Sequence, residues 1–354
     1  EMKGMRSSQL FRTVVRFASA AGLLSCCALV SCQKADEKPE PNELEGVYVV
    51  GSVDDANTAV LWENGALRRL ESGSHARSVA VAGKDVYAGG NEYNFDYDRW
   101  EARVWKNGVL QALDLGDAEY ARLESLTVAE GNVYVLGFLS KGAGQQYDVP
   151  VVWKNGMLVC RLTDGNEGAM VSSIVVSGSD VYVGGSCGTA DGPSVVTLWK
   201  NGAPQKLSDG IYSASLTALA ISDGAVYAVG YEFRGDDLIG MLWRNGVPTQ
   251  LCEASYRSML LGVCVDGSDV YVAIWSVGGN GQAGMYAVLW KNGEMELLPA
   301  KGLADIRAVT VSKGHVYVTG HYDINAGAVG VWKDGKLIPL PGEGYAAVFG
   351  IFVK

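Results

Sequence analysis

Three polar side chains in similar local settings are the residues of this sequence best suited to chemistry. Glu124 could act as a general acid or base, and Arg77 or Arg307 could stabilise a developing negative charge. Such a set would serve a polysaccharide lyase or hydrolase, although hydrolysis needs two carboxylates about 5–10 Å apart and no obvious second one is present. Each of the three stands directly before one of a series of small residues, which are Ser78, Ser125, Ser173, Ala218, Gly262, Ala308 and Gly350.

The remaining positions of this series are mixed in character. Ser172, Thr217, Leu261 and Phe349 occupy the same place before a small residue, and His75, Arg122 and Asp305 lie two residues before Arg77, Glu124 and Arg307. Together these side chains would line either a small-ligand site or the hydrated wall of a channel.

One short segment is unusually aromatic. Residues 93–100 read Tyr-Asn-Phe-Asp-Tyr-Asp-Arg-Trp. The spacing of Asn94, Asp96 and Asp98 is similar to that of a calcium loop, but the Gly and the later Glu that such a loop requires are missing. The whole chain contains three His, so it also offers little material for a metal site built from histidines. We therefore expect no metal and no cofactor.

A second motif match has a simple explanation. Residues 184–188 fit Gly-x-Ser-x-Gly, which marks a nucleophile where it forms a turn between a strand and a helix. Here a loop and then another strand are expected to follow. We interpret the match as chance in a glycine-rich chain, and we assign no catalytic residue.

Two repeated motifs indicate the elements that position these residues. A Leu/Val-Trp-Lys/Arg/Glu-Asn/Asp-Gly motif recurs every 42–48 residues, and a Val-Tyr-Val/Ala motif keeps step with it. The repeated aromatic residues are Trp62, Trp105, Trp153, Trp199, Trp243, Trp290 and Trp332, and Tyr48, Tyr87, Tyr134, Tyr182, Tyr227, Tyr271 and Tyr317. A period of this length with strand-like motifs is typical of a β-propeller.

We therefore predict an all-β, seven-bladed β-propeller with four-stranded antiparallel blades. Asn-Gly is the strongest short-range hairpin signal and predicts the turn between the third and fourth strands. The last blade should be closed by an inner strand from the C-terminus, residues 347–353, joined to three strands within residues 46–70. The repeated Trp and Tyr should pack between blades, because they recur in every unit.

Binding residues are expected where the repeat varies, since loops on a rigid scaffold carry function. Topology should place the longer loops together on one face. Aromatic residues outside the repeats fall in or beside these loops, and they would form either a recognition surface or the packing of the loops themselves. The candidate ligand-binding residues are Tyr93, Tyr97, Trp100, Tyr212, Tyr256 and Trp275 on the loops, with Arg77, Glu124 and Arg307 near the channel.

The N-terminus is typical of a targeting segment. A basic start is followed by a mostly apolar stretch, residues 17–30, that suits a signal peptide. The sequence Leu-Val-Ser-Cys ending at Cys32 resembles a bacterial lipoprotein box, which predicts a signal peptide over residues 1–31 and lipidation of Cys32. Residues 32–45 are polar and charged and should form a flexible tether. The propeller should then occupy residues 46–354.

Bulk properties exclude some partners. The net charge of −10 argues against a nucleic-acid partner, because such proteins need basic patches. Beyond Cys32 the chain has Cys160, Cys187, Cys252 and Cys264, which have no metal-site spacing. We expect buried free thiols, although the sequence leaves a disulfide open.

The repeat Ala-x-Leu-Trp-x-Asn-Gly followed by Val-Tyr-x-x-Gly resembles the extracellular repeats known as HAF repeats. The chain is also similar to seven-bladed β-propeller lipoproteins of Gram-negative envelopes, and the resemblance implies a protein of the outer membrane, periplasmic or surface-facing. We predict a monomeric, non-enzymatic binding module that recognises a glycan or a protein and meets the membrane through its lipid anchor alone. The alternatives are the lyase or hydrolase above and a structural partner in a complex.

Overall fold

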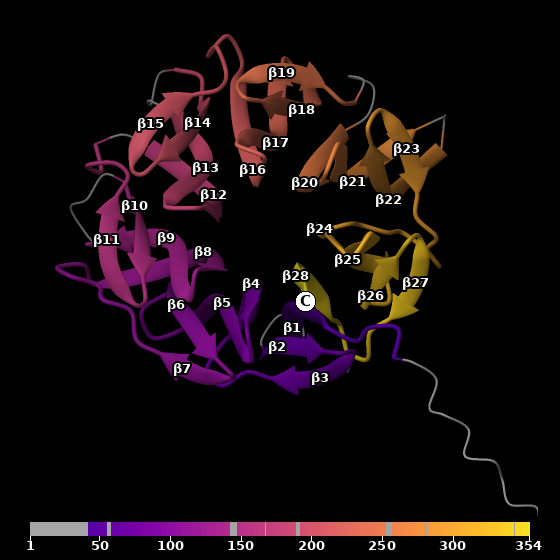
Figure 1. Ribbon diagram of the computed structural model, residues 1–354, viewed down its shortest axis with the longest axis horizontal. Coiled ribbons are helices and arrows are strands. Elements are labelled where there is room, and N and C mark those ends of the chain that lie inside the picture. Colours follow the sequence, from indigo (N-terminus) through magenta and orange to yellow (C-terminus); the bar gives the residue numbers. More distant parts are fainter. Residues whose placement is uncertain are drawn as a thin grey trace, which may run out of the picture. The chain divides into compact units, whose positions relative to one another are not determined.

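The repeat seen in the sequence corresponds to a repeat of strands. The computed structural model describes residues 42–54, 58–141, 147–166, 168–188, 192–252, 257–279, 282–342 and 344–354. In this part of the chain, seven four-stranded antiparallel sheets stand around a central axis (Figure 1). The predicted seven-bladed β-propeller is thus confirmed. The predicted signal peptide, Cys32 and nearly all of the predicted tether lie outside the described residues.

The blades are numbered in chain order, each from its inner to its outer strand. Blade one contains β4 (His75–Ala82), β5 (Asp85–Asn94), β6 (Arg99–Lys106) and β7 (Val109–Gln111). Blade two contains β8 (Tyr120–Ala129), β9 (Asn132–Ser140), β10 (Val149–Lys154) and β11 (Met157–Arg161). Blade three contains β12 (Gly168–Ser177), β13 (Asp180–Gly188), β14 (Val195–Lys200) and β15 (Ala203–Lys206).

The other blades follow the same plan. Blade four contains β16 (Ser213–Ser222), β17 (Ala225–Arg234), β18 (Asp237–Arg244) and β19 (Val247–Gln250). Blade five contains β20 (Arg257–Asp266), β21 (Asp269–Gly279), β22 (Gln282–Lys291) and β23 (Glu294–Leu297). Blade six contains β24 (Ala308–Ser312), β25 (His315–Asp323), β26 (Ala328–Lys333) and β27 (Lys336–Pro339). The closing blade contains β28 (Ala347–Val353), β1 (Val47–Val53), β2 (Thr58–Glu63) and β3 (Ala66–Arg69).

The closing blade joins the two ends of the propeller, as predicted. β28 is its inner strand and pairs antiparallel with β1, with Tyr48 opposite Phe352 and Val50 opposite Gly350. The backbone N–H of Lys354 donates to the carbonyl of Gly46 at 3.0 Å. Because each hydrogen bond adds only about 1 kcal/mol net, the larger gain is that the faces of the neighbouring blades are covered.

The Asn-Gly motif, replaced by Asp334-Gly335 in blade six, forms the turn between the third and fourth strands of each blade. In blade one, Asn107 and Gly108 have φ values of 52° and 80°, as a type I′ turn requires. The side chain of Asn107 also accepts a hydrogen bond from the backbone N–H of Val86 at 2.8 Å. One residue thus forms the turn and ties it to the start of the second strand.

The repeated Trp are scaffold residues, as expected. All seven are buried. Four of the indole N–H groups donate to backbone carbonyls in the linker that enters their own blade: Trp62 to Pro341, Trp105 to Glu71, Trp153 to Asp114 and Trp332 to Pro299, at 2.6–2.8 Å. Each of these indoles therefore fills the core and fixes a connection between blades.

A β-bulge in the inner strand explains the glycine three residues after the repeated Tyr. The pairing of β12 with β13 skips Ser172, and a Cβ built on Gly185 would stand 2.0 Å from the carbonyl oxygen of Met170. Equivalent bulges skip Arg77, Glu124, Thr217, Leu261 and Phe349. Bulges re-aim side chains, and these bulges turn one residue of each strand toward the central axis.

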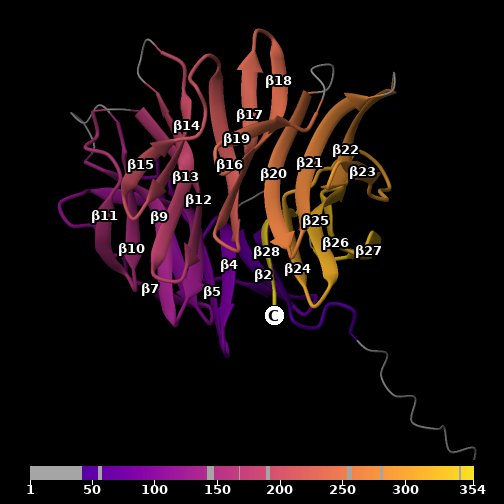
Figure 2. The ribbon, with the colours of Figure 1, turned by 45° about the horizontal axis from the view of Figure 1, so that its top comes forward.

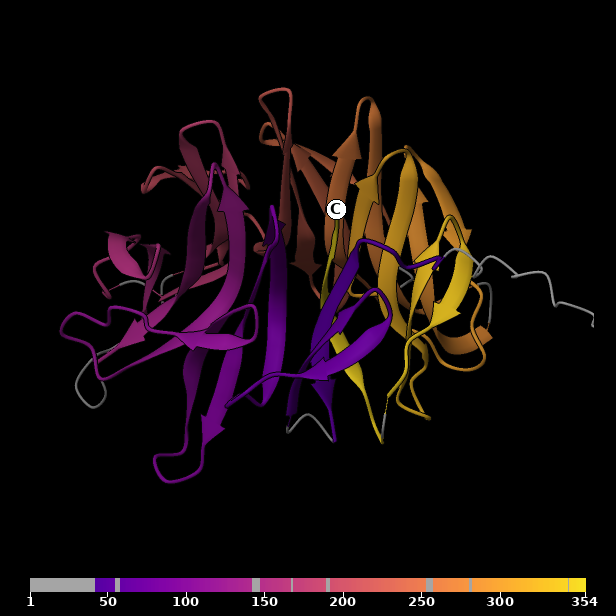
Figure 3. The ribbon, with the colours of Figure 1, turned by 60° about the horizontal axis from the view of Figure 1, so that its bottom comes forward.

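The strands run roughly along the ring axis, so their connections gather at its two faces (Figures 2 and 3). We call the face that carries the β5–β6, β17–β18 and equivalent connections, together with the linkers between blades, the loop face. No helix in the described part of the chain is long and apolar enough to cross a membrane. Among the described cysteines, Cys252 is buried, whereas Cys160, Cys187 and Cys264 are half-buried, and all four are free thiols.

Replacing Gly185 by Ala should destabilise the propeller by about 1–3 kcal/mol or more, because the new methyl group overlaps a backbone carbonyl. Gly168→Ala in the same sheet is the matched control, since its Cβ would meet the Tyr147 ring at 3.3 Å and no backbone atom closer than 3.4 Å. Urea unfolding followed by tryptophan fluorescence measures both. Equal stability of the two variants would contradict the role given to the bulge.

Candidate functional site

The six bulge residues and Arg307, which directly precedes β24, surround a central cavity of about 480 Å³. Arg77, Glu124 and Arg307, which the sequence singled out, all line it. The other residues of this set at its wall are Ser172, Thr217, Leu261 and Phe349. The structure therefore brings together the seven positions that precede the recurring small residues. We call them the channel ring.

Glu124 lies between two arginines. Arg122 binds its Oε1 in a very close contact, and the Nη2 of Arg77 lies 3.3 Å from its Oε2. The guanidinium of Arg122 also lies 4.0 Å from the ring centroid of Phe138, which holds it against blade two. Glu124 is thus a paired carboxylate whose charge is offset from both sides.

Arg307 is held by a chain of buried polar groups. Its Nε and Nη2 both donate to Oδ2 of Asp305, at 3.0 and 2.6 Å. The other oxygen of Asp305 accepts from the backbone N–H of His321 and contacts Nδ1 of the same residue, each at 2.9 Å. Burial by itself would raise the pKa of Asp305, but the hydrogen bonds from His321 and the charge of Arg307 lower it below its usual range. Asp305 therefore stays ionised and orients Arg307.

The remaining polar members of the ring connect blades. The hydroxyl of Ser172 donates to the carbonyl of Leu216 at 2.8 Å, and the hydroxyl of Thr217 donates to that of Val229 at 3.0 Å and also to that of Leu260. Their protons are directed into the protein, so the oxygen lone pairs are left to accept hydrogen bonds from the cavity.

His75 links the channel ring to the aromatic segment. It lies two residues before Arg77 on β4, and its ring centroid is 4.8 Å from that of Trp100 and 5.9 Å from that of Phe349. Burial and the nearby charge of Arg77 lower the pKa of His75 to about 4. The imidazole is therefore neutral at pH 7.

The aromatic segment forms the β5–β6 hairpin on the loop face. Phe95, Tyr97 and Trp100 are 81%, 67% and 39% exposed. The Tyr93 ring lies edge-on to both Phe95 and Trp100, with centroids 4.9 Å away in each case. We call Tyr93, Phe95, Tyr97 and Trp100 the hairpin cluster.

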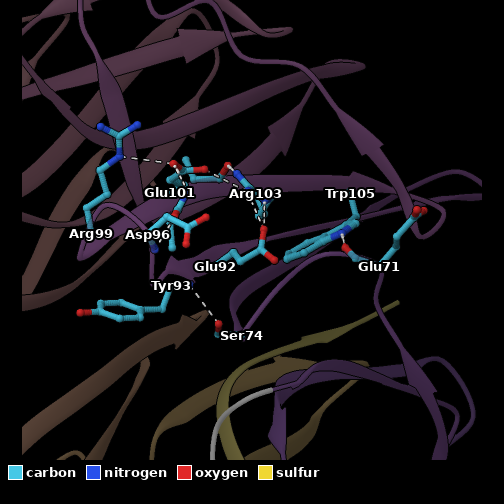
Figure 4. Close-up of polar contacts among 11 residues, drawn as sticks. Glu71, Ser74, Glu92, Tyr93, Asp96, Arg99, Glu101, Arg103 and Trp105 are labelled. Carbon is cyan, nitrogen blue, oxygen red and sulfur yellow. Dashed lines mark hydrogen bonds and ion pairs between the residues drawn. The ribbon is translucent and has the colours of Figure 1, made fainter.

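Ion pairs join the two strands of the hairpin (Figure 4). Arg103 binds both Glu92 and Glu101, and Arg99 binds Glu101 at 3.3 Å. Burial alone would raise the pKa of Glu101, but hydrogen bonds from Arg103, Asn94 and Arg99 lower it. The network joins the two strands on the face opposite Tyr93 and Trp100.

Side chains of the segment whose spacing is similar to that of a calcium loop form hydrogen bonds within the hairpin. Asn94 binds Glu101 and the backbone N–H of Asp96, and Asp98 accepts a hydrogen bond from the Tyr93 hydroxyl. The described residues contain no group of three or more His, Cys, Asp or Glu placed to hold a metal ion. Ser186 of the Gly-x-Ser-x-Gly match is buried within β13, opposite Val196, so it does not lie at a strand–helix turn.

The other candidate residues lie apart from these two groups. Tyr212 is exposed before β16, with the Arg234 guanidinium 5.3 Å from its ring centroid. Trp275 packs on the core shared by blades five and six, and its buried indole N–H has no partner among the described residues. Tyr256 lies outside the described residues.

Sequence reasoning also missed one cavity. A space of about 420 Å³ between blades two and three is lined by Arg122, Phe138, Tyr147, Asp148, Gly168, Ala169, Met170, Ser186, Gly188 and Ser194. These residues belong to separate repeats and follow no shared spacing, so no pattern in the sequence marks them as neighbours.

Comparisons with known proteins concern the fold of this chain. No family model and no curated protein matches this chain. Among solved structures, it is similar to the β-propeller domain of the Trilobed protease from Pyrococcus furiosus, described with an open velcro topology: TM-score 0.52, 15% identity, covering 83% of this chain and 93% of that one. In this chain, by contrast, β28 and β1 close the ring.

Two peptidases are similar over part of their length. An acylaminoacyl peptidase in complex with Z-Gly-Gly-Phe-chloromethyl ketone has a TM-score of 0.51 at 14% identity, covering 83% of this chain and 50% of that one. A Mycobacterium tuberculosis puromycin-hydrolyzing peptidase has a TM-score of 0.51 at 11% identity, covering 83% and 53%. This chain spans about half their length, and at such identities the likeness shows the β-propeller fold alone.

The low pKa of His75 predicts a pH-dependent stability. In the unfolded chain its pKa is about 6.5, so between pH 6.5 and 4 the unfolded state binds a proton that the folded state does not. The free energy of unfolding is therefore unaffected by protonation of His75 above pH 6.5, and it decreases as the pH falls from 6.5 toward 4. His75→Phe should therefore lose less stability than the parent protein between pH 7 and 4.5, by on the order of 1 kcal/mol. Urea unfolding at both pH values measures this, and parallel losses would contradict it.

Proposed function

We propose that this propeller is a non-enzymatic binding module of a bacterial cell envelope and that it recognises a glycan or another protein through its loop face. The observation that carries the proposal is the hairpin cluster, whose aromatic rings are exposed yet pack on one another. Aromatic side chains supply a large contact area at little cost in conformational entropy.

The stiffness of the hairpin supports this role. Exposed aromatic rings are usually costly in a soluble domain, and a patch of them marks an interaction site. The pairs that Arg103 forms with Glu92 and Glu101 join the two strands that carry the rings, so the hairpin is ordered before a partner arrives. A pre-ordered surface loses less entropy on binding.

The envelope location follows from the N-terminal segment. In this proposal Cys32 is lipidated and residues 33–45 form a tether, so the propeller is held at the outer membrane as a monomer, on its periplasmic or outer side. The resemblance to HAF repeats and to β-propeller lipoproteins of Gram-negative bacteria supports the same location. The lipid provides the membrane contact.

Replacing Tyr97 and Trp100 together by Ala should weaken binding to the partner by about 10- to 100-fold, because exposed rings at the centre of an interface contribute most of its energy. A glycan array and pull-down from envelope extract identify the partner and measure the loss. Phe233→Ala is the control, since this ring is 49% exposed on the β17–β18 hairpin. Undiminished binding by the double variant would contradict the proposal.

A second candidate function is a polysaccharide lyase or hydrolase with its site in the central cavity. It is favoured by the position of Glu124 between Arg77 and Arg122. The peptidase likeness supports hydrolysis only loosely, since it concerns the fold. This alternative predicts product release from a glycan library and its loss in Glu124→Gln, by about 100-fold or more. The binding module predicts no product from either protein.

A further inference from the structure

The charge around the central cavity is opposite in sign to that of the whole chain. The chain carries a net charge of −10. The charged residues that line the cavity are Arg77, Arg307 and Glu124, which leaves one formal positive charge. We propose that this cavity binds the carboxylate of an acidic ligand, either a uronic acid or another small carboxylate.

Arg77 is the cation that remains available. Glu124 is already bound closely by Arg122, whereas its contact with Arg77 is longer, at 3.3 Å. The side chain of Arg77 is 42% exposed and that of Glu124 is 13% exposed. A guanidinium has five N–H donors, so the single contact from Nη2 leaves most of them for a ligand.

Arg307 is held in place for the same ligand. The Nε and Nη2 of Arg307 donate to Asp305, whereas Nη1 takes no part in this ion pair. Because His321 fixes Asp305 from the other side, the guanidinium is oriented before a ligand arrives. Pre-orientation of this kind lowers the entropy lost on binding a carboxylate.

The neighbours of these arginines suit a ring-shaped acid. The inner strands follow the order β24, β28, β4 around the axis, so Arg307 and Arg77 stand on either side of Phe349. Across the cavity, the oxygens of Ser172 and Thr217 can accept hydrogen bonds from ligand hydroxyls. The volume of about 480 Å³ lies in the range of small-molecule sites, about 300–1,000 Å³.

A longer acidic glycan could extend from this cavity to the loop face. Phe349, His75 and Trp100 form a continuous line of ring contacts from the channel ring to the hairpin cluster. This extension rests on the proposed recognition role of the hairpin, whereas carboxylate binding in the cavity does not.

Calorimetry on the whole chain with D-glucuronate, D-glucose and tri-galacturonate tests the inference. The two acids should bind and glucose should not. Arg77→Gln should weaken binding of both acids by about 10- to 100-fold, because it removes a charged hydrogen-bond donor while Glu124 keeps Arg122. Arg307→Lys keeps a positive charge near Asp305 but loses the paired donors, and it should weaken binding about 10-fold. Arg161→Gln on the outer strand β11 makes the same change of charge away from the cavity and should bind as the parent does.

Each outcome separates the two proposals. Equal binding of glucose and glucuronate, no binding of either acid, or full binding by Arg77→Gln would overturn the carboxylate site, even if Tyr97 and Trp100 prove essential for another partner. Arg77-dependent binding that survives the loss of both aromatic residues would support the site and count against the hairpin. A gain in affinity for tri-galacturonate over glucuronate that Trp100→Ala removes identifies a polysaccharide as the source of the carboxylate, and equal affinities identify a free acid.

Discussion

The close approach of a carbonyl to a glycine determines how this propeller presents side chains to its axis. In blade one, a Cβ on residue 90 would lie 2.0 Å from the carbonyl oxygen of His75. Glycine has no Cβ, so it can occupy this position without a clash. The crowding comes from the bulge that skips Arg77. An inner strand without that bulge would keep strict alternation, and its side chains would point to the faces of its own blade. Six of the seven blades have a glycine at this close approach, and blade five, with Ile274, is the exception.

The repeat separates residues that build the fold from residues that are free to vary. Trp105 fills a core position and binds the linker carbonyl of Glu71, and Asn107 forms the turn and binds Val86. The core position and the turn are common to all seven blades, so their residues recur. The side chain at the position before the small residue makes no contact that is common to all blades, and Arg, Glu, Ser, Thr, Leu and Phe all occur there. The blades share one structure and differ in the residue that faces the axis, so the cavity is lined by charged, polar and apolar side chains.

Much of the fold could be predicted from the sequence because the repeat is local. The Trp and Tyr motifs, the Asn-Gly turns and the two half-blades at the ends all appear as short patterns with a fixed spacing. The site was predictable in position, since Arg77, Glu124 and Arg307 precede the recurring small residues. The side chains that these residues contact could not be predicted in the same way. The contact of Asp305 with His321 joins the linker before β24 to β25, and that of Glu124 with Arg77 joins two blades. Both depend on packing that a linear pattern does not contain.

Blade five shows what happens when the glycine is absent. Ile274 stands at the glycine position, and Trp275, a candidate ligand-binding residue from the sequence, follows it. In the structure Ile274 is buried opposite Leu260, and Gly262 comes directly after the bulge, as Gly350 does in the closing blade. Trp275 packs against the core between blades five and six and leaves its indole N–H without a partner among the described residues, at a cost of about 1–3 kcal/mol. Ile274 and Trp275 therefore fill space in the core of the blades. Apolar Leu261 is the residue of blade five that faces the cavity. The polar character of the channel ring is thus interrupted where packing between blades takes precedence.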